Sequence, residues 1–111
     1  MKILTPIEKR KRTLNKKKIL QKKIQKGIKY RNQGFKSINT GDYKEAISYF
    51  EKALKLFPVD NIRYDWTIDN LGRAIYFYCK KRMSEIDNFL ETDEAKSLEK
   101  LLITWQNVKK C

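Results

Sequence analysis

The stretch from Gly27 to Pro58 constrains the fold more than any other part of the sequence. Gly41 can adopt the positive φ that ends one helix, and Asp42 can cap the next helix through its side-chain oxygen. Pro58 has no N–H and disfavours helix at Phe57, so this second helix should end there. Spacings of three and four place the apolar residues between these signals on one helix face: Ala46, Phe50, Ala53, Leu54 and Phe57. The stretch therefore predicts a helical hairpin.

The same spacing resembles one tetratricopeptide repeat, a helix–turn–helix unit of about 34 residues. The residues that match this family in register are Gly34, Tyr43, Ala46, Phe50, Ala53 and Pro58. The resemblance covers about residues 27–60 and departs from the family at Ser37 and Gln33, where the family has larger apolar residues. An ordinary antiparallel helix pair with small residues at its crossing is the alternative interpretation.

The chain beyond the hairpin also predicts helices and no strands. Asp60 or Asn61 can cap a helix with a long apolar stripe. This stripe comprises Tyr64, Ile68, Leu71, Ile75 and Cys79. The pair Leu71-Gly72 resembles the start of a degenerate second repeat near Asp65, which lacks the small and aromatic residues of a second helix.

Further helix starts are expected at Ser84 with Asp87, and at Thr92 or Asp93. The last helix is amphipathic and should cover the apolar end of an incomplete repeat array. Its apolar residues are Leu98, Leu101, Leu102, Trp105 and Val108. The sequence thus predicts an all-α fold of four or five helices: a tetratricopeptide-like hairpin with capping helices.

Positive charge is concentrated in the N-terminal third. Residues 1–36 contain 14 Lys and Arg against one acid, which gives +13, so residues 37–111 contain 12 basic and 12 acidic residues and are neutral. One helix from about Pro6 to Asn39, roughly 50 Å long, could connect this segment to the hairpin. Repulsion between lysines four residues apart should fray it unless a polyanion neutralises the charge. We therefore divide the chain into a basic arm, residues 1–26, and a helical domain, residues 27–111.

The basic arm predicts contact with RNA phosphate, because closely spaced lysines neutralise a polyanion without reading sequence. Lysine outnumbers arginine 20 to 6, which favours point-charge contacts over bidentate reading of bases. A solvated helix without specific role, a nuclear-type targeting signal and an acidic membrane surface are the other interpretations. The candidate RNA-binding residues are Lys9, Arg10, Lys11, Arg12, Lys16, Lys17, Lys18, Lys22, Lys23 and Lys26.

The composition argues against an enzyme. Histidine, the commonest general base and metal ligand, is absent, and Cys79 and Cys111 are too far apart in sequence to suggest a zinc site. No nucleophile–base pair or glycine-rich phosphate loop is present. We expect no catalytic residue, no metal, no cofactor and no membrane span.

The resemblance to tetratricopeptide repeats implies a concave surface, lined by the first helix of each repeat, that binds protein segments. The residues that this register assigns to protein binding are Arg31, Asn32, Phe35, Asn70, Arg73, Tyr76 and Phe77. The alternative is that Trp66, Tyr76 and Phe77 fill the core or a fixed protein interface.

These observations predict a non-catalytic scaffold or adaptor whose arm binds RNA, best of all ribosomal RNA, while the helical body contacts neighbouring proteins. Richness in Lys, Ile, Asn and Tyr suggests an organelle matrix, mitochondrial or plastid, with the nucleus as the alternative compartment. Two other functions remain open. The chain could be a protein–protein adaptor or assembly factor, or a peripheral subunit of a membrane complex, with the arm as a targeting or docking signal.

Overall fold

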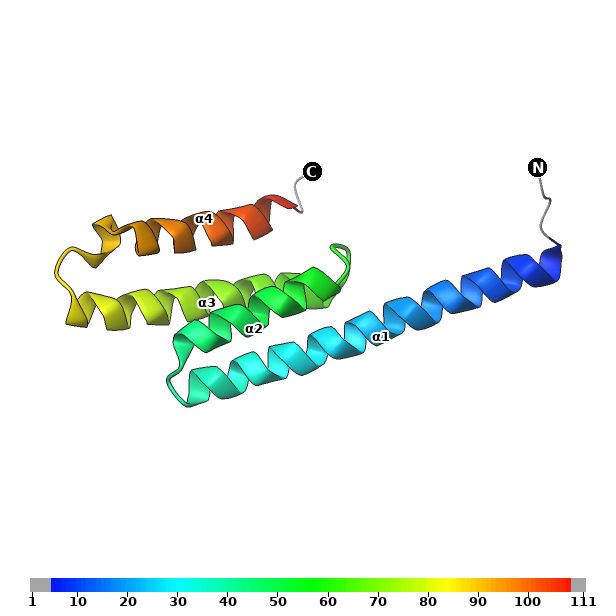
Figure 1. Cartoon of the computed structure of the whole chain (residues 1–111), viewed down its shortest axis with the longest axis horizontal. Coiled ribbons are helices and arrows are strands. Elements are labelled where there is room, and N and C mark those ends of the chain that lie inside the picture. Colours follow the sequence, from blue (N-terminus) through cyan, green and yellow to red (C-terminus); the bar gives the residue numbers. More distant parts are fainter. Residues whose placement is uncertain (1–4, 109–111) are drawn as a thin grey trace.

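The computed structural model describes residues 5–108, apart from the side chain of Glu8, and this part of the chain contains helices and no strands. The helices are α1 (Pro6–Asn39), α2 (Tyr43–Leu56), α3 (Ile62–Glu85) and α4 (Asp93–Val108), with a short 3₁₀ helix, η1 (Phe89–Glu91), before α4. Successive helices run antiparallel to one another, and the N-terminal half of α1 extends beyond the others (Figure 1). The predicted all-α fold is confirmed, and the N-terminal segment, which could be a helix or an irregular arm, is part of the long helix α1.

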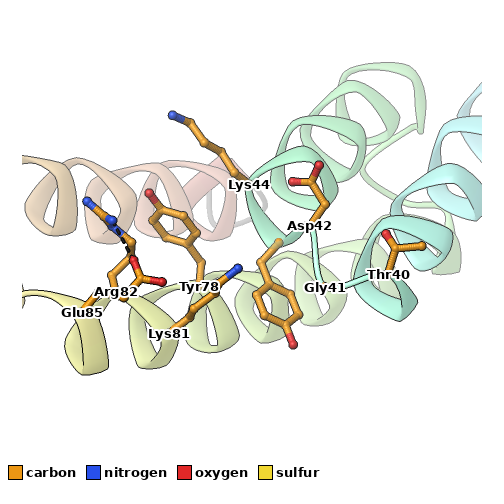
Figure 2. A pocket seen from close by; sticks show the side chains of 9 residues that line it. Thr40, Gly41, Asp42, Lys44, Tyr78, Lys81, Arg82 and Glu85 are labelled. Carbon is orange, nitrogen blue, oxygen red and sulfur yellow. Dashed lines mark hydrogen bonds and ion pairs between the residues drawn. The ribbon is translucent and has the colours of Figure 1, made fainter.

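The turn between α1 and α2 forms as the sequence predicts. Gly41 has φ +82°, and its N–H donates to the carbonyl of Ile38. Asp42, at the start of α2 in Figure 2, accepts a hydrogen bond from the N–H of Glu45 at 3.1 Å. At the other end, Phe57 is extended, with ψ 134°, directly before Pro58. Local backbone chemistry therefore sets both ends of α2.

The two helices of the hairpin approach closely because α1 has glycines where they cross. A Cβ added at Gly34 would lie 2.5 Å from Cε1 of Phe50, and one added at Gly27 would lie 2.6 Å from Cε1 of Phe57. Both aromatic rings therefore lie directly against the α1 backbone. The core built around this contact is formed by α2 and α3: Ala46, Ile47, Phe50, Ala53, Leu54, Phe57, Tyr64, Leu71, Ala74 and Ile75.

Gly34→Ala should lower the free energy of unfolding by about 1–2 kcal/mol. Overpacking against the buried Phe50 ring costs about 1–3 kcal/mol, and the higher helix propensity of alanine returns only part of it. Gly72→Ala is the matched control, since its added Cβ would lie 3.8 Å from Leu102, an ordinary contact. This control should gain up to about 1 kcal/mol. Urea unfolding followed by circular dichroism measures both, and equal effects of the two changes would contradict the close crossing.

Helix α3 is longer than the first helix of a repeat. It begins at the Asn61 cap, whose side chain accepts a hydrogen bond from the N–H of Arg63 at 2.9 Å, and it continues to Glu85. The predicted helix start at Ser84 and Asp87 is wrong. Ser84 lies in the last turn of α3, where its hydroxyl donates to the carbonyl of Lys81 and leaves the helix intact.

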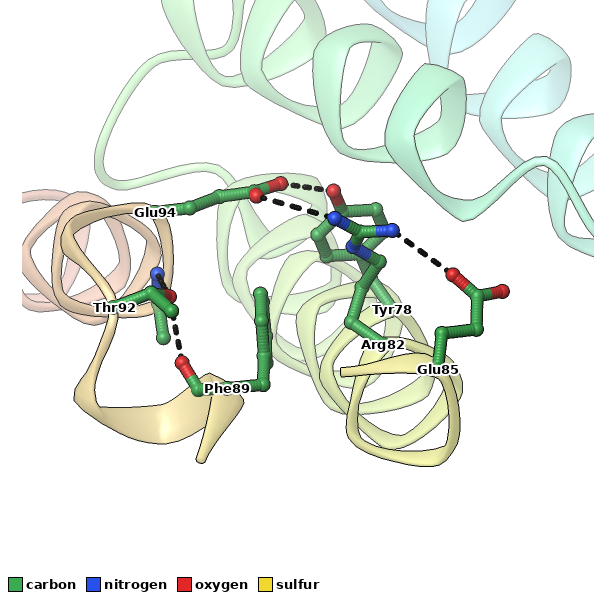
Figure 3. Close-up of polar contacts among 7 residues, drawn as sticks. Tyr78, Arg82, Glu85, Phe89, Thr92 and Glu94 are labelled. Atoms are coloured by element: carbon green, nitrogen blue, oxygen red, sulfur yellow. Dashed lines mark hydrogen bonds and ion pairs between the residues drawn. The ribbon is translucent and has the colours of Figure 1, made fainter. Parts of the chain in front are cut away.

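Helix α4 is joined to α3 by a small polar network (Figure 3). Arg82 pairs with Glu85 at 2.9 Å and reaches Glu94 of α4 at 3.9 Å, while the Tyr78 hydroxyl donates to Glu94. Phe89, only 1% exposed, packs edge-on against Tyr78 beneath this network. These contacts fix the start of α4 beside the end of α3.

The two ends of α4 are set by separate interactions. The predicted Thr92 cap is confirmed, because its hydroxyl accepts a hydrogen bond from the N–H of Ala95 at 3.3 Å. Farther along, the Tyr64 hydroxyl donates to the carbonyl of Trp105 at 3.0 Å. Leu98, Leu101, Leu102 and Trp105 pack against the core. Val108 is 42% exposed, so its assignment to this apolar face is wrong; it lies beyond the anchor at Trp105.

Candidate functional site

The first candidate surface is the basic part of α1 from Lys9 to Lys26, here called the cationic segment. All ten predicted RNA-binding residues in it are exposed, and none forms an ion pair with a side chain that the structure describes. At 100° per residue, most of them lie on one half of the helix circumference. The segment therefore presents an uncompensated basic face along the part of α1 that projects from the body (Figure 1).

The cationic segment is helical, although repulsion between its lysines predicts fraying. Helix α1 is continuous from Pro6 to Asn39, so the boundary that we place after Lys26 falls inside it. Each repulsive pair at i, i+4 costs only about 0.2–0.5 kcal/mol, and long lysine side chains can spread apart in solvent. A helix rather than an irregular chain thus carries the charge and fixes its spacing.

The second candidate surface is the one that the repeat register predicts from residues of α1 and α3, and it is here called the concave surface. The Arg31 guanidinium lies between two rings, with Cζ 4.9 Å from the Phe35 centroid and 5.5 Å from the Trp66 centroid. Burial, together with the nearby positive charge of Arg63, lowers the pKa of Arg31. The structure therefore brings Arg31 and Phe35 together with Trp66, which is 46% exposed.

Two hydrogen-bond donors on the concave surface are unused. Nε of Arg31 and Nδ2 of Asn70 are buried and have no hydrogen-bond partner within the described part of the chain. A buried donor without a partner costs about 1–3 kcal/mol. Both atoms are closed to solvent, so an incoming acceptor reaches them only when neighbouring side chains move. Carbonyl and carboxylate oxygens are acceptors of this kind.

The remaining residues assigned to protein binding have mixed surroundings. Asn32 and Arg73 are exposed, and Tyr76 is 60% exposed. Phe77 stacks on Tyr43 of α2, with centroids 5.5 Å apart, and so helps to join α2 to α3. Phe35 likewise packs edge-on against Phe50. The interpretation of Trp66 and Tyr76 as core residues is wrong, because both keep much of their surface exposed.

The hollow at the α1–α2 turn, shown in Figure 2, has a volume of about 370 Å³. Thr40, Asp42 and Lys44 line one side of it, and Tyr78, Lys81 and the Arg82–Glu85 pair line the other. Hydrogen bonding to Glu85 raises the pKa of Arg82, and burial raises the pKa of Tyr78. These groups form no nucleophile–base pair.

Residues 5–108 offer neither a metal site nor a membrane-spanning helix. No three His, Cys, Asp or Glu side chains in this range lie close enough together to hold a metal ion. Burial, with Glu94 nearby, raises the pKa of the half-buried thiol of Cys79, which disfavours the reactive thiolate, while Cys111 lies outside the described residues. None of the helices in this range has the length and apolar character needed to cross a bilayer.

Sequence reasoning did not foresee the pairing of Tyr30 with Tyr49. Tyr30 of α1 and Tyr49 of α2 stack with centroids 6.3 Å apart and an interplanar angle of 25°. Lys52 lies over both rings, at 5.7 Å from Tyr30 and 5.5 Å from Tyr49. Tyr30 had a visible signal, an aromatic residue directly after the lysine run. Nothing in the sequence indicates that Tyr49 and Lys52 lie beside Tyr30, because this depends on how α2 packs against α1.

Comparison with known families gives one match. Residues 28–58 match the family model described as tetratricopeptide repeat. Comparisons with curated proteins and with solved structures give no match. The matched residues comprise the crossing of α1 with α2, the Gly41 turn and the end of α2 at Pro58. The repeat indicates a protein-interaction scaffold, and residues 28–58 of this all-α chain are a tetratricopeptide repeat.

Proposed function

We propose that the protein is a non-catalytic scaffold that binds RNA phosphate through the cationic segment and neighbouring proteins through its helical body. Its setting is a large ribonucleoprotein, a ribosome in the first instance, in an organelle matrix. The observation that carries this proposal is the exposed and uncompensated basic face of α1, which projects from a body, residues 27–111, with a net charge of only +3.

RNA is the polyanion that this face fits best. Phosphate contacts by lysine give affinity without sequence reading, and lysine dominates the segment. An anionic lipid surface would favour aromatic and large apolar residues along the helix, whereas Lys9–Lys26 contains only Leu14, Ile19, Leu20 and Ile24 among its basic residues. The lysine-rich helix therefore supports phosphate contact in solution over insertion at a membrane surface.

The concave surface supports the protein-binding half of the proposal. Trp66 and Tyr76 offer exposed aromatic area, and the unused donors of Arg31 and Asn70 suit the carbonyl groups of an extended segment. Arg31 is held between two rings from α1 and α3, so its guanidinium is already oriented. A protein segment that crosses α1 and α3 would use both features.

Sedimentation of the native particle, with and without ribonuclease, tests this function. We expect the protein to sediment with an RNA-containing particle and to be released when the RNA is digested. Neighbours that stay bound after digestion should be released by a variant carrying Arg31→Ala and Asn70→Ala. A particle that ribonuclease leaves unchanged would instead identify a protein–protein adaptor. Flotation with acidic liposomes would identify the membrane alternative.

A further inference from the structure

The tyrosine pair Tyr30–Tyr49 lies where the cationic segment meets α2. Its rings are inclined by only 25°, and both side chains are half-buried, so part of each tyrosine remains exposed to solvent. Lys26 lies 5.9 Å from the Tyr30 centroid, and Lys52 lies over both rings. Aromatic rings combined with basic side chains are typical of sites that bind nucleic-acid single strands.

The same α1 face continues the basic run into this pair. Lys22, Lys26 and Tyr30 are four residues apart and therefore adjacent on the helix. Together with Gln25, Lys29 and Gln33 they line a hollow of about 540 Å³. Ammonium groups there can bind phosphate, and the glutamine amides can hydrogen-bond to base edges. The hollow thus combines a charge, a hydrogen-bonding group and a ring within one helix face.

We infer that this surface binds unpaired bases of single-stranded RNA, which stack on Tyr30 and Tyr49 while Lys22, Lys26 and Lys52 contact the adjoining phosphates. The inference rests on the proposed RNA binding and adds a preference for single strands over duplex. Bases in a duplex are stacked on one another and leave no face for the rings. The lysine–ring contacts are weak at an exposed site, so an incoming base can displace the ammonium groups toward phosphate.

Glu45 fits this arrangement. Its carboxylate accepts a hydrogen bond from the Tyr49 hydroxyl, which raises the pKa of that tyrosine. The hydroxyl is thereby engaged within α2, and the ring face is the part of Tyr49 left for a ligand. Packing between α1 and α2 alone would need the ring area but not the lysines around it.

The test uses the full-length protein and two RNA probes with equal numbers of phosphates: an unstructured single strand carrying 2-aminopurine, and a duplex. Wild type should bind the single strand at least about fivefold more tightly and quench the 2-aminopurine. The double variant Tyr30→Leu with Tyr49→Leu should lose at least about fivefold in single-strand affinity and lose the quenching. Its duplex affinity should be unchanged. Tyr30→Phe with Tyr49→Phe is the matched control, since it keeps both rings and should behave as wild type.

The outcomes separate this inference from the proposed function. If wild type binds both probes equally and the leucine variant changes neither, the stacking site is refuted while RNA binding by the cationic segment stands. Equal losses for both probes in the leucine variant also refute it, because they indicate a general defect. Wild type that binds neither probe refutes both proposals.

Discussion

RNA affinity of the wild-type protein should fall about 250- to 1,000-fold between about 50 and 200 mM salt. If six lysines contact phosphate, log K should decrease with log salt at a slope of about −4 to −5, because each contact releases a condensed counterion. A variant with six arm lysines changed to glutamine should lose more than half of this slope, because only Arg10, Arg12, Lys22 and Lys26 of the ten candidate residues remain. The six are Lys9, Lys11, Lys16, Lys17, Lys18 and Lys23, all exposed on α1.

A matched control removes the same charge from the body. Six exposed lysines there are changed to glutamine: Lys36, Lys44, Lys55, Lys80, Lys96 and Lys100. Net charge drops equally in the two variants, so a general electrostatic attraction would weaken both by the same factor. Contact through the cationic segment instead predicts that the control keeps the wild-type slope. Fluorescence anisotropy over a salt series measures all three proteins.

The arm variant should keep its helix, which separates lost contacts from lost structure. Glutamine is nearly as good a helix former as lysine, and the substitution removes like-charge pairs such as Lys18 with Lys22. Circular dichroism should therefore show equal or higher helix content. A steep salt slope that persists in the arm variant would place the phosphate contacts elsewhere and defeat the proposed role of α1.

The hairpin could be read from the sequence because its signals are local. Gly41, Asp42 and Pro58 act through the backbone of their immediate neighbours, and the spacing of the apolar residues fixes the face of α2 that is buried. None of these effects depends on what lies farther along the chain. The exposure of the basic residues could also be predicted from the sequence, because closely spaced like charges cannot be buried without partners.

The path of the chain after α3 could not be read in the same way. Ser84 and Asp87 have the chemistry of a helix cap, yet α3 continues through Ser84 and turns at Asn88, which has φ 59°. Tertiary contacts decide where the chain turns. Arg82 reaches Glu94 across the turn, and Phe89 is buried beneath it. These contacts join residues that are too far apart in sequence for a local capping pattern to reveal them.

The same distinction between local signals and tertiary contacts applies to the candidate sites. A family register assigned Arg31 and Asn70 to one surface, but only the folded structure shows that Arg31 of α1 reaches Trp66 of α3. The stacking of Tyr49 on Tyr30 likewise depends on how α2 crosses α1. Residue type and spacing thus identify charged surfaces well, whereas pairs made across helices require the crossing geometry.

Phe50→Ala should lower the free energy of unfolding by about 3–5 kcal/mol, which is a large share of the roughly 5–15 kcal/mol of a small domain. Phe50 has no exposed surface, lies against the backbone at Gly34 and packs edge-on against Phe35. Its removal leaves a cavity where α1 crosses α2, and the glycine opposite cannot fill it. Urea unfolding followed by circular dichroism measures the loss.

Tyr76→Ala is the matched control, an aromatic truncation on a side chain that is 60% exposed, and should change stability by no more than about 0.5 kcal/mol. RNA binding provides a second comparison on the same proteins. The cationic segment projects from the body and its charge does not depend on the core, so Phe50→Ala should keep the steep salt slope even where the hairpin is partly unfolded. Loss of the slope together with the fold would mean that phosphate is bound by the assembled body, and that α1 alone does not carry the contact.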